Sequence, residues 1–345
     1  MWVEIRKDIF EDSDFRGLYY VILILSWFPK TFPRYSLFID YEEVKGTVNF
    51  EELLRVDPSF KEIIDAQFNE FITRSSSVGQ KDYIVTKART GSNCFSIEES
   101  IRLFSRPLSL IVENSKNDSN FLKAIFYHFD DSGKLQEYIE NGWIKFDNAG
   151  GCTNVRNFIE EELRSFEDLA ARYSRNEFDY YRAFVLLDSD KAFSDQPMKT
   201  QYTSLISHFR TIGISEDGFH VLSKRTVENY MPDEVFRELK GTINDPDLLQ
   251  WIDAYLLLSD EQKDYLNIND GFPPGDLDED IKKLYESIIG TSNFTYLSKG
   301  FKLSGFKNRF TALFLNSGNI NKQSLKDRAG SEEFAEILSK IYKLL

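Results

Sequence analysis

The stretch Phe184-Val-Leu-Leu-Asp-Ser-Asp190 limits the possible folds of this chain more than any other part of its sequence. Its four consecutive large apolar residues, from Phe184 to Leu187, are typical of a strand buried on both faces, as in a parallel sheet. If the strand continues to Asp190, Asp188 and Asp190 point the same way, because residues i and i+2 share a face. Both carboxylates would then lie at the carboxyl end of the strand, where open α/β sheets bind their ligands.

Two carboxylates placed so close together indicate a binding site. Their like charges become favourable neighbours when a divalent cation lies between them and a phosphate group. Asp-Ser-Asp is also good turn chemistry, so a buried strand that runs into an ordinary polar turn is the alternative interpretation.

Three further segments predict short strands of the same sheet: Leu108–Val112, Trp143–Phe146 and Phe219–Leu222. The segments between them space their apolar residues as amphipathic helices do. Strands that alternate with helices at this spacing predict βαβ units and a parallel sheet. The expected fold class is therefore α/β, with a central parallel sheet flanked by helices.

Each of the four predicted strands is followed by an acidic residue, a glycine turn or a charged motif. The charged motif, Lys224-Arg-Thr-Val-Glu228-Asn-Tyr230, follows the strand predicted at Phe219–Leu222. Right-handed crossovers place the ends of parallel strands on one edge of the sheet, so we expect the polar residues after each strand to lie near one another. The residues expected along that edge are Glu113, Gly150, Gly151, Asp188, Asp190 and Glu228.

The Gly150-Gly151 turn precedes a predicted helix that starts near Asn154 and runs to about Arg172. The start of this helix either offers backbone N–H groups to a phosphate or is an ordinary glycine turn before a helix. The sequence alone leaves both interpretations open.

The chain divides into three predicted regions. Residues 1–105 form an α/β region that serves packing, dimerisation into a homodimer, or partner docking, since it holds no chemical motif. Residues 106–235 form the domain with the central sheet. Residues 236–345 form a mainly helical C-terminal region with a basic end. Within the first region, Gly17–Phe28 is a twelve-residue apolar run, too short to span a bilayer, and predicts a buried core strand or helix.

The composition is that of a globular protein, with 41% hydrophobic residues and a net charge of −14 over 345 residues. A charge of this sign argues against a protein that coats nucleic acid. Two cysteines cannot form a disulfide framework and fit a reducing cytoplasm, and three scattered histidines do not form a zinc-ligand spacing. We therefore expect a cytoplasmic protein that does not associate with membranes.

The C-terminal segment 291–345 departs from this acidic character, with nine Lys and Arg against four Asp and Glu. Such a segment either holds phosphates or forms a solvated helical face. If it contacts phosphates, the residues expected to do so are Lys299, Lys302, Lys307 and Arg309.

The ordered motifs resemble a Toprim domain, and more narrowly the Toprim nucleases of the OLD family and related phage-defence proteins. The resemblance covers roughly residues 106–234. It rests on Glu113, the Gly150-Gly151 turn, Asp188-Ser-Asp190 and the Lys224–Tyr230 motif. Family members often have Glu-Gly after the first strand and an Asp four residues after the Glu. Here Asn114 follows the Glu and the nearest acid is Asp118.

The resemblance implies a metal-dependent endonuclease that hydrolyses phosphodiester bonds with Mg²⁺ or Mn²⁺. Glu113, Asp118, Asp188 and Asp190 would hold the metal, and Glu228 would join as a ligand or orienting group. In the family a lysine beyond the acids assists catalysis. The candidates for this lysine are Lys299 and Lys302.

The OLD nucleases carry an ATPase in the same chain, but no GxxxxGK[ST] phosphate loop occurs here. The resemblance therefore implies a separate ATPase partner, weak activity of the isolated chain, a nucleic acid substrate (DNA or RNA, including tRNA), and a role in bacterial anti-phage defence. Two alternatives stand beside this expectation. One is a non-catalytic Toprim-like subunit that regulates an ATPase complex, and the other is a different Toprim enzyme, such as a primase or topoisomerase.

Overall fold

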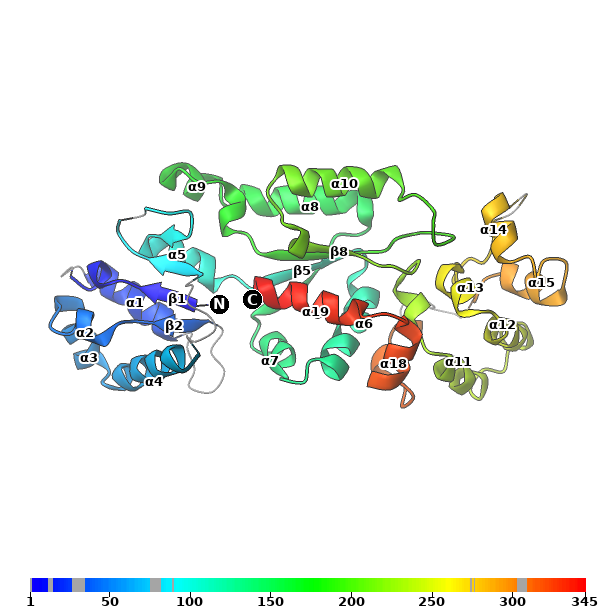
Figure 1. Cartoon of the computed structure of the whole chain (residues 1–345), viewed down its shortest axis with the longest axis horizontal. Coiled ribbons are helices and arrows are strands. Elements are labelled where there is room, and N and C mark those ends of the chain that lie inside the picture. The colour runs from blue at the N-terminus through cyan, green and yellow to red at the C-terminus, as the bar shows by residue number, and fades with distance from the viewer. Residues whose placement is uncertain are drawn as a thin grey trace.

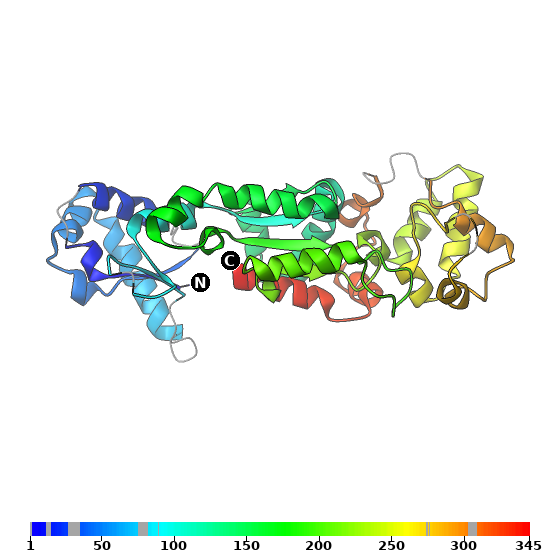
Figure 2. The same cartoon turned by 90° about the horizontal axis from the view of Figure 1, so that it is seen from above.

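The computed structural model describes residues 2–11, 15–26, 35–74, 82–88, 90–273, 275, 277–302 and 309–345. Two perpendicular views show an elongated molecule, with the N-terminal region at one end, a sheet-containing part in the middle and a group of helices at the other end (Figures 1 and 2). The chain forms two four-stranded parallel sheets, both flanked by helices. The structure thus confirms the α/β class predicted from the sequence.

The N-terminal region contains the first sheet, whose strand order is β2-β1-β3-β4 with every neighbouring pair parallel. Its strands are β1 (Trp2–Ile5), β2 (Ser36–Phe38), β3 (Tyr83–Val85) and β4 (Cys94–Phe95). Its helices are α1 (Phe15–Ser26), α2 (Tyr41–Val44), α3 (Val48–Val56), α4 (Ser59–Arg74) and α5 (Ile97–Ser105), and η1 (Lys7–Ile9) is a single 3₁₀ turn. The apolar run Gly17–Phe28, expected to be a core strand or helix, lies largely in α1.

The central sheet has the strand order β6-β5-β7-β8, again with parallel neighbours. Its strands are β5 (Leu108–Val112), β6 (Ile144–Asn148), β7 (Ala183–Leu187) and β8 (Phe219–Val221). All five residues of β5 and of β7 are buried, as expected for parallel strands covered on both faces, and the one polar residue among them, Ser109, donates its hydroxyl hydrogen bond to Asp147 at 2.7 Å. The four strands predicted from the sequence are therefore all present.

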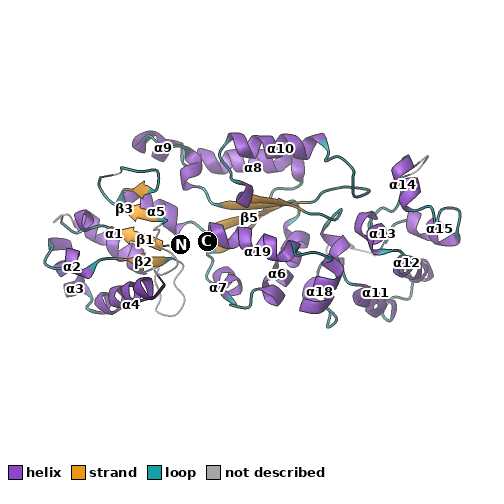
Figure 3. Cartoon of the chain, in the orientation of Figure 1, coloured by secondary structure: helices purple, strands orange, loops and turns teal. Residues whose placement is uncertain are grey.

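Helices cover both faces of the central sheet (Figures 1 and 3). Alternate residues of a strand point to opposite faces, so Leu110 and Leu186 pack toward one set of helices while Ile111 and Val185 pack toward the other. The helices on the first face are α6 (Ser115–Phe129), α7 (Lys134–Glu140) and α19 (Glu333–Leu344), and those on the second are α8 (Cys152–Arg164) and α10 (Thr200–Thr211).

The helical end of the molecule follows β8 in the chain. It contains α11 (Asp233–Lys240), α12 (Pro246–Leu256), α13 (Asp260–Tyr265), α14 (Glu279–Leu284) and α15 (Ser292–Ser298). The chain then returns to the sheet through α17 (Leu313–Asn316) and α18 (Lys322–Ala329) before α19. None of the helices that the structure describes is long and apolar enough to cross a lipid bilayer.

Two segments pack outside the regions to which the sequence assigned them. In the predicted C-terminal region 236–345, α19 buries Ile337 and Ile341 in the same core as Leu110 of the sheet. In the predicted central domain 106–235, the helix expected to run unbroken to Arg172 breaks after α8. The following α9 (Glu167–Tyr173) and η2 (Glu177–Tyr180) join the N-terminal core. Regions drawn along the sequence cannot anticipate these contacts, because they depend on where the chain returns in space.

Candidate functional site

A cavity of about 470 Å³ lies at the carboxyl ends of the central strands. We call it the acidic cavity, because all five carboxylates predicted to belong to the site line it: Glu113, Asp118, Asp188, Asp190 and Glu228. Part of its wall comes from the segment after α13, which is distant in sequence. The residues lining it are Glu113, Asn114, Asn117, Asp118, Asn148, Gly150, Gly151, Asp188, Asp190, Arg225, Thr226, Glu228, Asn267, Ile268, Asn269 and Asp270.

Glu113, directly after β5, connects the ends of the neighbouring segments. Its Oε1 atom accepts a hydrogen bond from the backbone N–H of Asp188 at 3.2 Å, and its Oε2 atom accepts one from the N–H of Cys152 at 3.1 Å. The hydroxyl of Tyr202 on α10 lies 3.4 Å from Oε1. Burial raises the pKa of Glu113, the negative charge of Asp190 raises it further, and these hydrogen bonds act in the opposite direction.

The Gly150-Gly151 turn serves Glu113. The N–H of Gly151 donates to the backbone carbonyl of Glu113 at 3.0 Å, while the N–H of Cys152, the first residue of α8, donates to the side chain. Both glycines have positive φ, 74° and 112°, which residues with a side chain rarely adopt. The helix begins at Cys152 and not near Asn154. Its first N–H group binds a carboxylate of the protein, Glu113, in an arrangement that neither of the two sequence interpretations anticipated.

Asp188 and Asp190 both line the acidic cavity, but the strand does not place them there. β7 ends at Leu187, so the predicted extension of the strand to Asp190 is wrong. Asp190 has φ of 54°, in the left-handed region that Asp tolerates better than most residues. The N–H groups of Ser189 and Asp190 donate to the carbonyl of Arg225 at 3.1 and 2.9 Å. A turn bound to the segment after β8 therefore directs both carboxylates into the cavity.

The carboxylates of the cavity repel one another. Burial raises the pKa of Asp188 well above its usual range, and the charges of Asp118, Glu113, Glu228 and Asp190 raise it further. Burial likewise raises the pKa of Asp118 to about 7, against the backbone hydrogen bond from Asn114 to its Oδ2 atom at 2.8 Å. The cavity thus concentrates negative charge where solvent screens it poorly, and binding of a cation there would relieve the repulsion.

The donor set suits a hard cation, since Mg²⁺ prefers carboxylate oxygens and keeps several of its waters. Among the residues that the structure describes, however, no group of three or more His, Cys, Asp or Glu side chains is arranged to hold a metal ion. The predicted ligands Glu113, Asp118, Asp188 and Asp190 therefore share a cavity without forming a ready-made coordination shell. One or two carboxylates are sufficient for many Mg²⁺ sites, so the residues present fit the ion.

Two cationic side chains, Lys199 and Arg225, lie at the cavity. The Nζ atom of Lys199 lies 3.0 Å from Asp190 Oδ2, and the hydroxyl oxygen of Tyr202 lies 3.2 Å from the same carboxylate atom. Arg225 is the only Lys or Arg among the described residues that line the cavity. Its Nη1 atom donates to the carbonyl of Lys191 at 3.3 Å. These three residues were not predicted as site residues, although Arg225 lies within the quoted Lys224–Tyr230 motif.

The lysines expected to assist catalysis do not line the acidic cavity. Lys302 lies 2.9 Å from Asp270, a residue of the cavity wall, and is exposed at the rim. Lys299 lies 3.5 Å from Asp247 on α12. Lys307 is outside the described residues. The sequence could not align these lysines, because no strand or motif adjacent to them fixes their position relative to the sheet.

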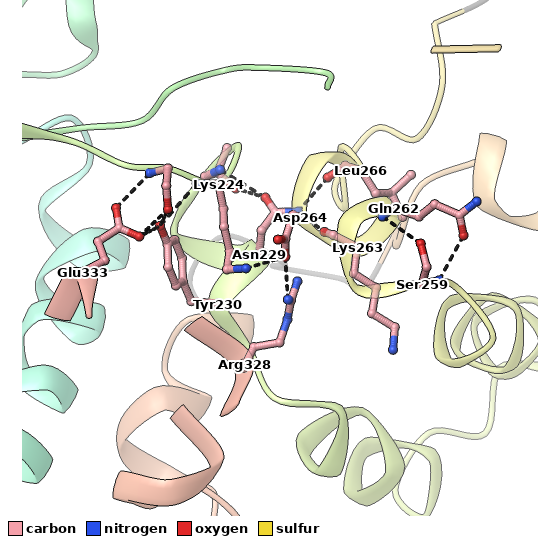
Figure 4. Close-up of polar contacts among 12 residues, drawn as sticks. Lys224, Asn229, Tyr230, Ser259, Gln262, Lys263, Asp264, Leu266, Arg328 and Glu333 are labelled. Atoms are coloured by element: carbon pink, nitrogen blue, oxygen red, sulfur yellow. Dashed lines mark hydrogen bonds and ion pairs between the residues drawn. The ribbon is translucent and has the colours of Figure 1, made fainter. Parts of the chain in front are cut away.

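The Lys224–Tyr230 motif divides into residues of a supporting network, shown in Figure 4, and residues that line the cavity. Lys224 and Arg328 both pair with Asp264 of α13. Asn229 donates to the backbone carbonyls of Lys263 and Leu266 at 2.7 and 2.9 Å. Tyr230 donates its hydroxyl hydrogen bond to Glu333 at the start of α19. The residues labelled in the figure are Lys224, Asn229, Tyr230, Ser259, Gln262, Lys263, Asp264, Leu266, Arg328 and Glu333.

This buried network holds η4 (Val227–Tyr230) against α13 and α19. The other residues of the motif, Arg225, Thr226 and Glu228, line the cavity. The network therefore fixes the position of the cavity wall, and the side chains of Lys224, Asn229 and Tyr230 are engaged within the protein. The sequence predicted a role in the site for Glu228 alone among the residues of this motif, and the alternation of buried and cavity-lining residues appears only in the structure.

Comparison with known proteins found no family model, no curated protein and no solved structure that matches this chain.

Proposed function

We propose that this chain is a metal-dependent nuclease of the Toprim type, resembling the OLD family, that hydrolyses phosphodiester bonds in DNA or RNA. One observation carries the proposal: the acids and the Gly-Gly turn that follow successive strands of a parallel sheet all line one cavity at the strand ends. Ligands of open α/β sheets bind at this edge. Acidic sites with a divalent cation are a recurrent means of phosphodiester hydrolysis.

The roles proposed for the residues follow from their positions. Glu113, Asp188 and Asp190 would hold one or two Mg²⁺ ions, with Asp118 and Glu228 as further carboxylates of the same cavity. When bound, the metal would supply a Lewis acid for the phosphate and an activated water. Tyr202 and Lys199 orient Asp190, and the backbone N–H of Cys152 orients Glu113. Arg225 is the cation positioned to offset negative charge on a bound phosphate.

The resemblance further suggests an effector of bacterial anti-phage defence that acts with a separate ATPase. The net charge of −14 supports dependence on a partner, because long-range repulsion slows the approach of nucleic acid to an acidic protein. A second function, that of a non-catalytic subunit regulating such an ATPase, is favoured by one specific observation. The described residues contain no ready-made metal cluster.

A cleavage assay separates these functions. The purified chain is incubated with plasmid, single-stranded DNA and tRNA, in Mg²⁺, Mn²⁺ or EDTA. We expect cleavage of at least one substrate that requires the metal and is lost in EDTA and in Asp188→Asn. Cleavage that is equal in EDTA, or that persists in the variant, contradicts the proposal. Binding of nucleic acid or of an ATPase without any metal-dependent cleavage supports the regulatory function.

A further inference from the structure

A second cavity, of about 310 Å³, adjoins the acidic cavity. Arg225, Asn267 and Asp270 line both, so the two cavities meet at these residues. The remaining walls of the second cavity are largely apolar and aromatic, and include Tyr265, Phe272, Ile281 and Tyr285. We call it the aromatic pocket. It is at the small end of the roughly 300–1,000 Å³ range of small-molecule pockets, which suits one flat ring system.

The aromatic walls are fixed before any ligand binds. The hydroxyl of Tyr285 donates to the carbonyl of Gln262 at 2.6 Å, and its ring meets Phe272 edge to face at a centroid distance of 4.7 Å. Phe272 in turn stacks on Phe294 at 4.9 Å. Gln262 belongs to the polar contacts around α13 (Figure 4). The same network around α13 therefore holds both the wall of the aromatic pocket and the wall of the acidic cavity. A pocket built in this way loses little conformational entropy on binding.

The polar residues at the junction of the two cavities indicate the chemical class of the ligand. Among the residues that the structure describes, Arg225 makes no ion pair with a carboxylate and one side-chain hydrogen bond, to the Lys191 carbonyl. A guanidinium in this position favours an anionic group such as a phosphate. Asn267 also lines this junction: its Oδ1 atom accepts the N–H of Asp270 at 2.9 Å, and its amide N–H₂ group is a hydrogen-bond donor in the pocket wall. The complementary ligand has a phosphate joined to a flat, polar-edged ring.

We propose that the aromatic pocket binds one unstacked nucleobase of a single-stranded or locally unpaired nucleic acid, with the adjoining phosphate at Arg225 and the scissile bond at the acidic cavity. This inference rests on the proposed nuclease function and narrows its substrate. A base inside a duplex cannot enter a pocket without leaving the stack. Stacking on aromatic side chains tolerates any base, so the pocket selects single strands without selecting a sequence.

Binding measured in EDTA tests the pocket without requiring catalysis. The probes are single-stranded oligonucleotides, of DNA and of RNA, that carry one abasic residue at successive positions. Removal of one base should weaken binding to the wild type by roughly 5- to 150-fold, as expected for the loss of one base–aromatic stack. Ile281→Trp fills the pocket and should abolish this difference, while the affinity for the abasic strand stays unchanged.

The matched control is Ile289→Trp, since Ile289 lies shortly after α14 but is 40% exposed and outside both cavities. It should behave as wild type, and thermal melting should show both variants folded. Tyr265→Leu, which removes an aromatic wall without filling the pocket, should reduce the base dependence. Two results would contradict the proposed base pocket but not the nuclease function. One is oligonucleotide binding that does not weaken when a base is removed, and the other is a weakening that persists in Ile281→Trp. Metal-dependent cleavage without any preference for unpaired substrates also overturns the base pocket. If no nucleic acid is bound or cleaved, both proposals fail.

Discussion

The carboxylate of Glu113 accepts a hydrogen bond from the backbone N–H of Asp188 at 3.2 Å, which joins the ends of the two central strands β5 and β7. The two residues are 75 positions apart in the sequence. Their contact fixes the spacing between two of the acids proposed to bind metal. The charge of Glu113 also raises the pKa of Asp188. The carboxylate of Glu113 therefore accepts a hydrogen bond from the backbone of Asp188 while it repels the carboxylate of the same residue.

Replacing either strand-end aspartate should remove activity without unfolding the protein. Asp188→Asn keeps an acceptor for the N–H of Val227, and Asp190→Asn keeps a residue that tolerates positive φ. Each change lowers the repulsion in the acidic cavity, so the melting temperature should hold or rise. Cleavage should fall by more than the roughly 10- to 100-fold typical of losing an outer-shell partner. Asp168→Asn, an exposed change on α9, is the control. Wild-type cleavage by either cavity variant would contradict the metal site.

Magnesium should stabilise the folded protein through the same carboxylates. At a free concentration about 100 times the dissociation constant, a ligand specific for the folded state adds about 2.7 kcal/mol to the free energy of unfolding. We expect the melting temperature measured by scanning calorimetry to rise with Mg²⁺ in the wild type and in Asp168→Asn, and to change little in Asp188→Asn. An equal rise in all three proteins would assign the effect to non-specific binding.

Arg225 should contribute one phosphate contact to nucleic acid binding. Arg225→Gln should weaken binding and make the slope of log K against log salt shallower by about 0.7 to 0.9, the value for one phosphate. Lys299→Gln removes the same charge at a site paired with Asp247, outside both cavities, and should leave the slope unchanged. Fluorescence anisotropy over a salt series measures both. A slope altered only by Lys299→Gln would place the phosphate contacts in the basic C-terminal segment instead.

Gly300 should not tolerate a side chain. Its φ is 71°, and an added Cβ would meet the backbone of Asn269 and Asp270, two residues of the cavity wall. Gly300→Ala should therefore lower the free energy of unfolding by about 1–3 kcal/mol and also weaken nucleic acid binding. Gly318→Ala is the control, because nothing lies within 4 Å of its added Cβ, and should change stability by no more than about 1 kcal/mol. Urea unfolding tests both. Equal stabilities would show that the wall yields to the added methyl group.

The stabilising effect of Glu333 should depend on pH. Hydrogen bonds from His220, Ser223 and Tyr230 lower the pKa of its carboxyl group against the opposing effect of burial. A depressed folded-state pKa stabilises the fold above the unfolded value, and this stabilisation is lost as pH falls through the folded value. Glu333→Gln should cost roughly 2–4 kcal/mol at pH 7.

The difference between wild type and Glu333→Gln should shrink once the pH falls below about 4, the unfolded pKa of glutamate. Melting curves from pH 3 to pH 7 measure it. Glu332→Gln serves as the matched control. Glu332 precedes Glu333 in the chain but is exposed, and it forms a surface ion pair with Lys326 at 3.3 Å. Such surface pairs contribute at most about 1 kcal/mol to the free energy of unfolding. A constant difference across the pH range would contradict the assigned ionisation of Glu333.

The sequence by itself determined the central sheet and the identity of its acids. The apolar runs of β5, interrupted only by Ser109, and of β7 are local patterns, since burial on both faces favours apolar residues along the whole strand. Parallel strands joined by crossovers must end on the same edge. The order of strands and acids therefore predicts that Glu113, Asp188, Asp190 and Glu228 meet at that edge.

Only the tertiary structure decided how those acids are held and what stands beside them. The left-handed turn at Asp190 depends on the carbonyl of Arg225, which lies 35 residues further along the chain. The wall formed by residues 267–270, the rim position of Lys302 and the return of α19 onto the sheet depend on the same kind of distant contact. A local pattern encodes which face of an element is buried. It does not encode the partner that buries it, because many partners offer the same apolar surface. Turn-forming residues likewise do not specify the distant carbonyl that accepts their backbone hydrogen bonds.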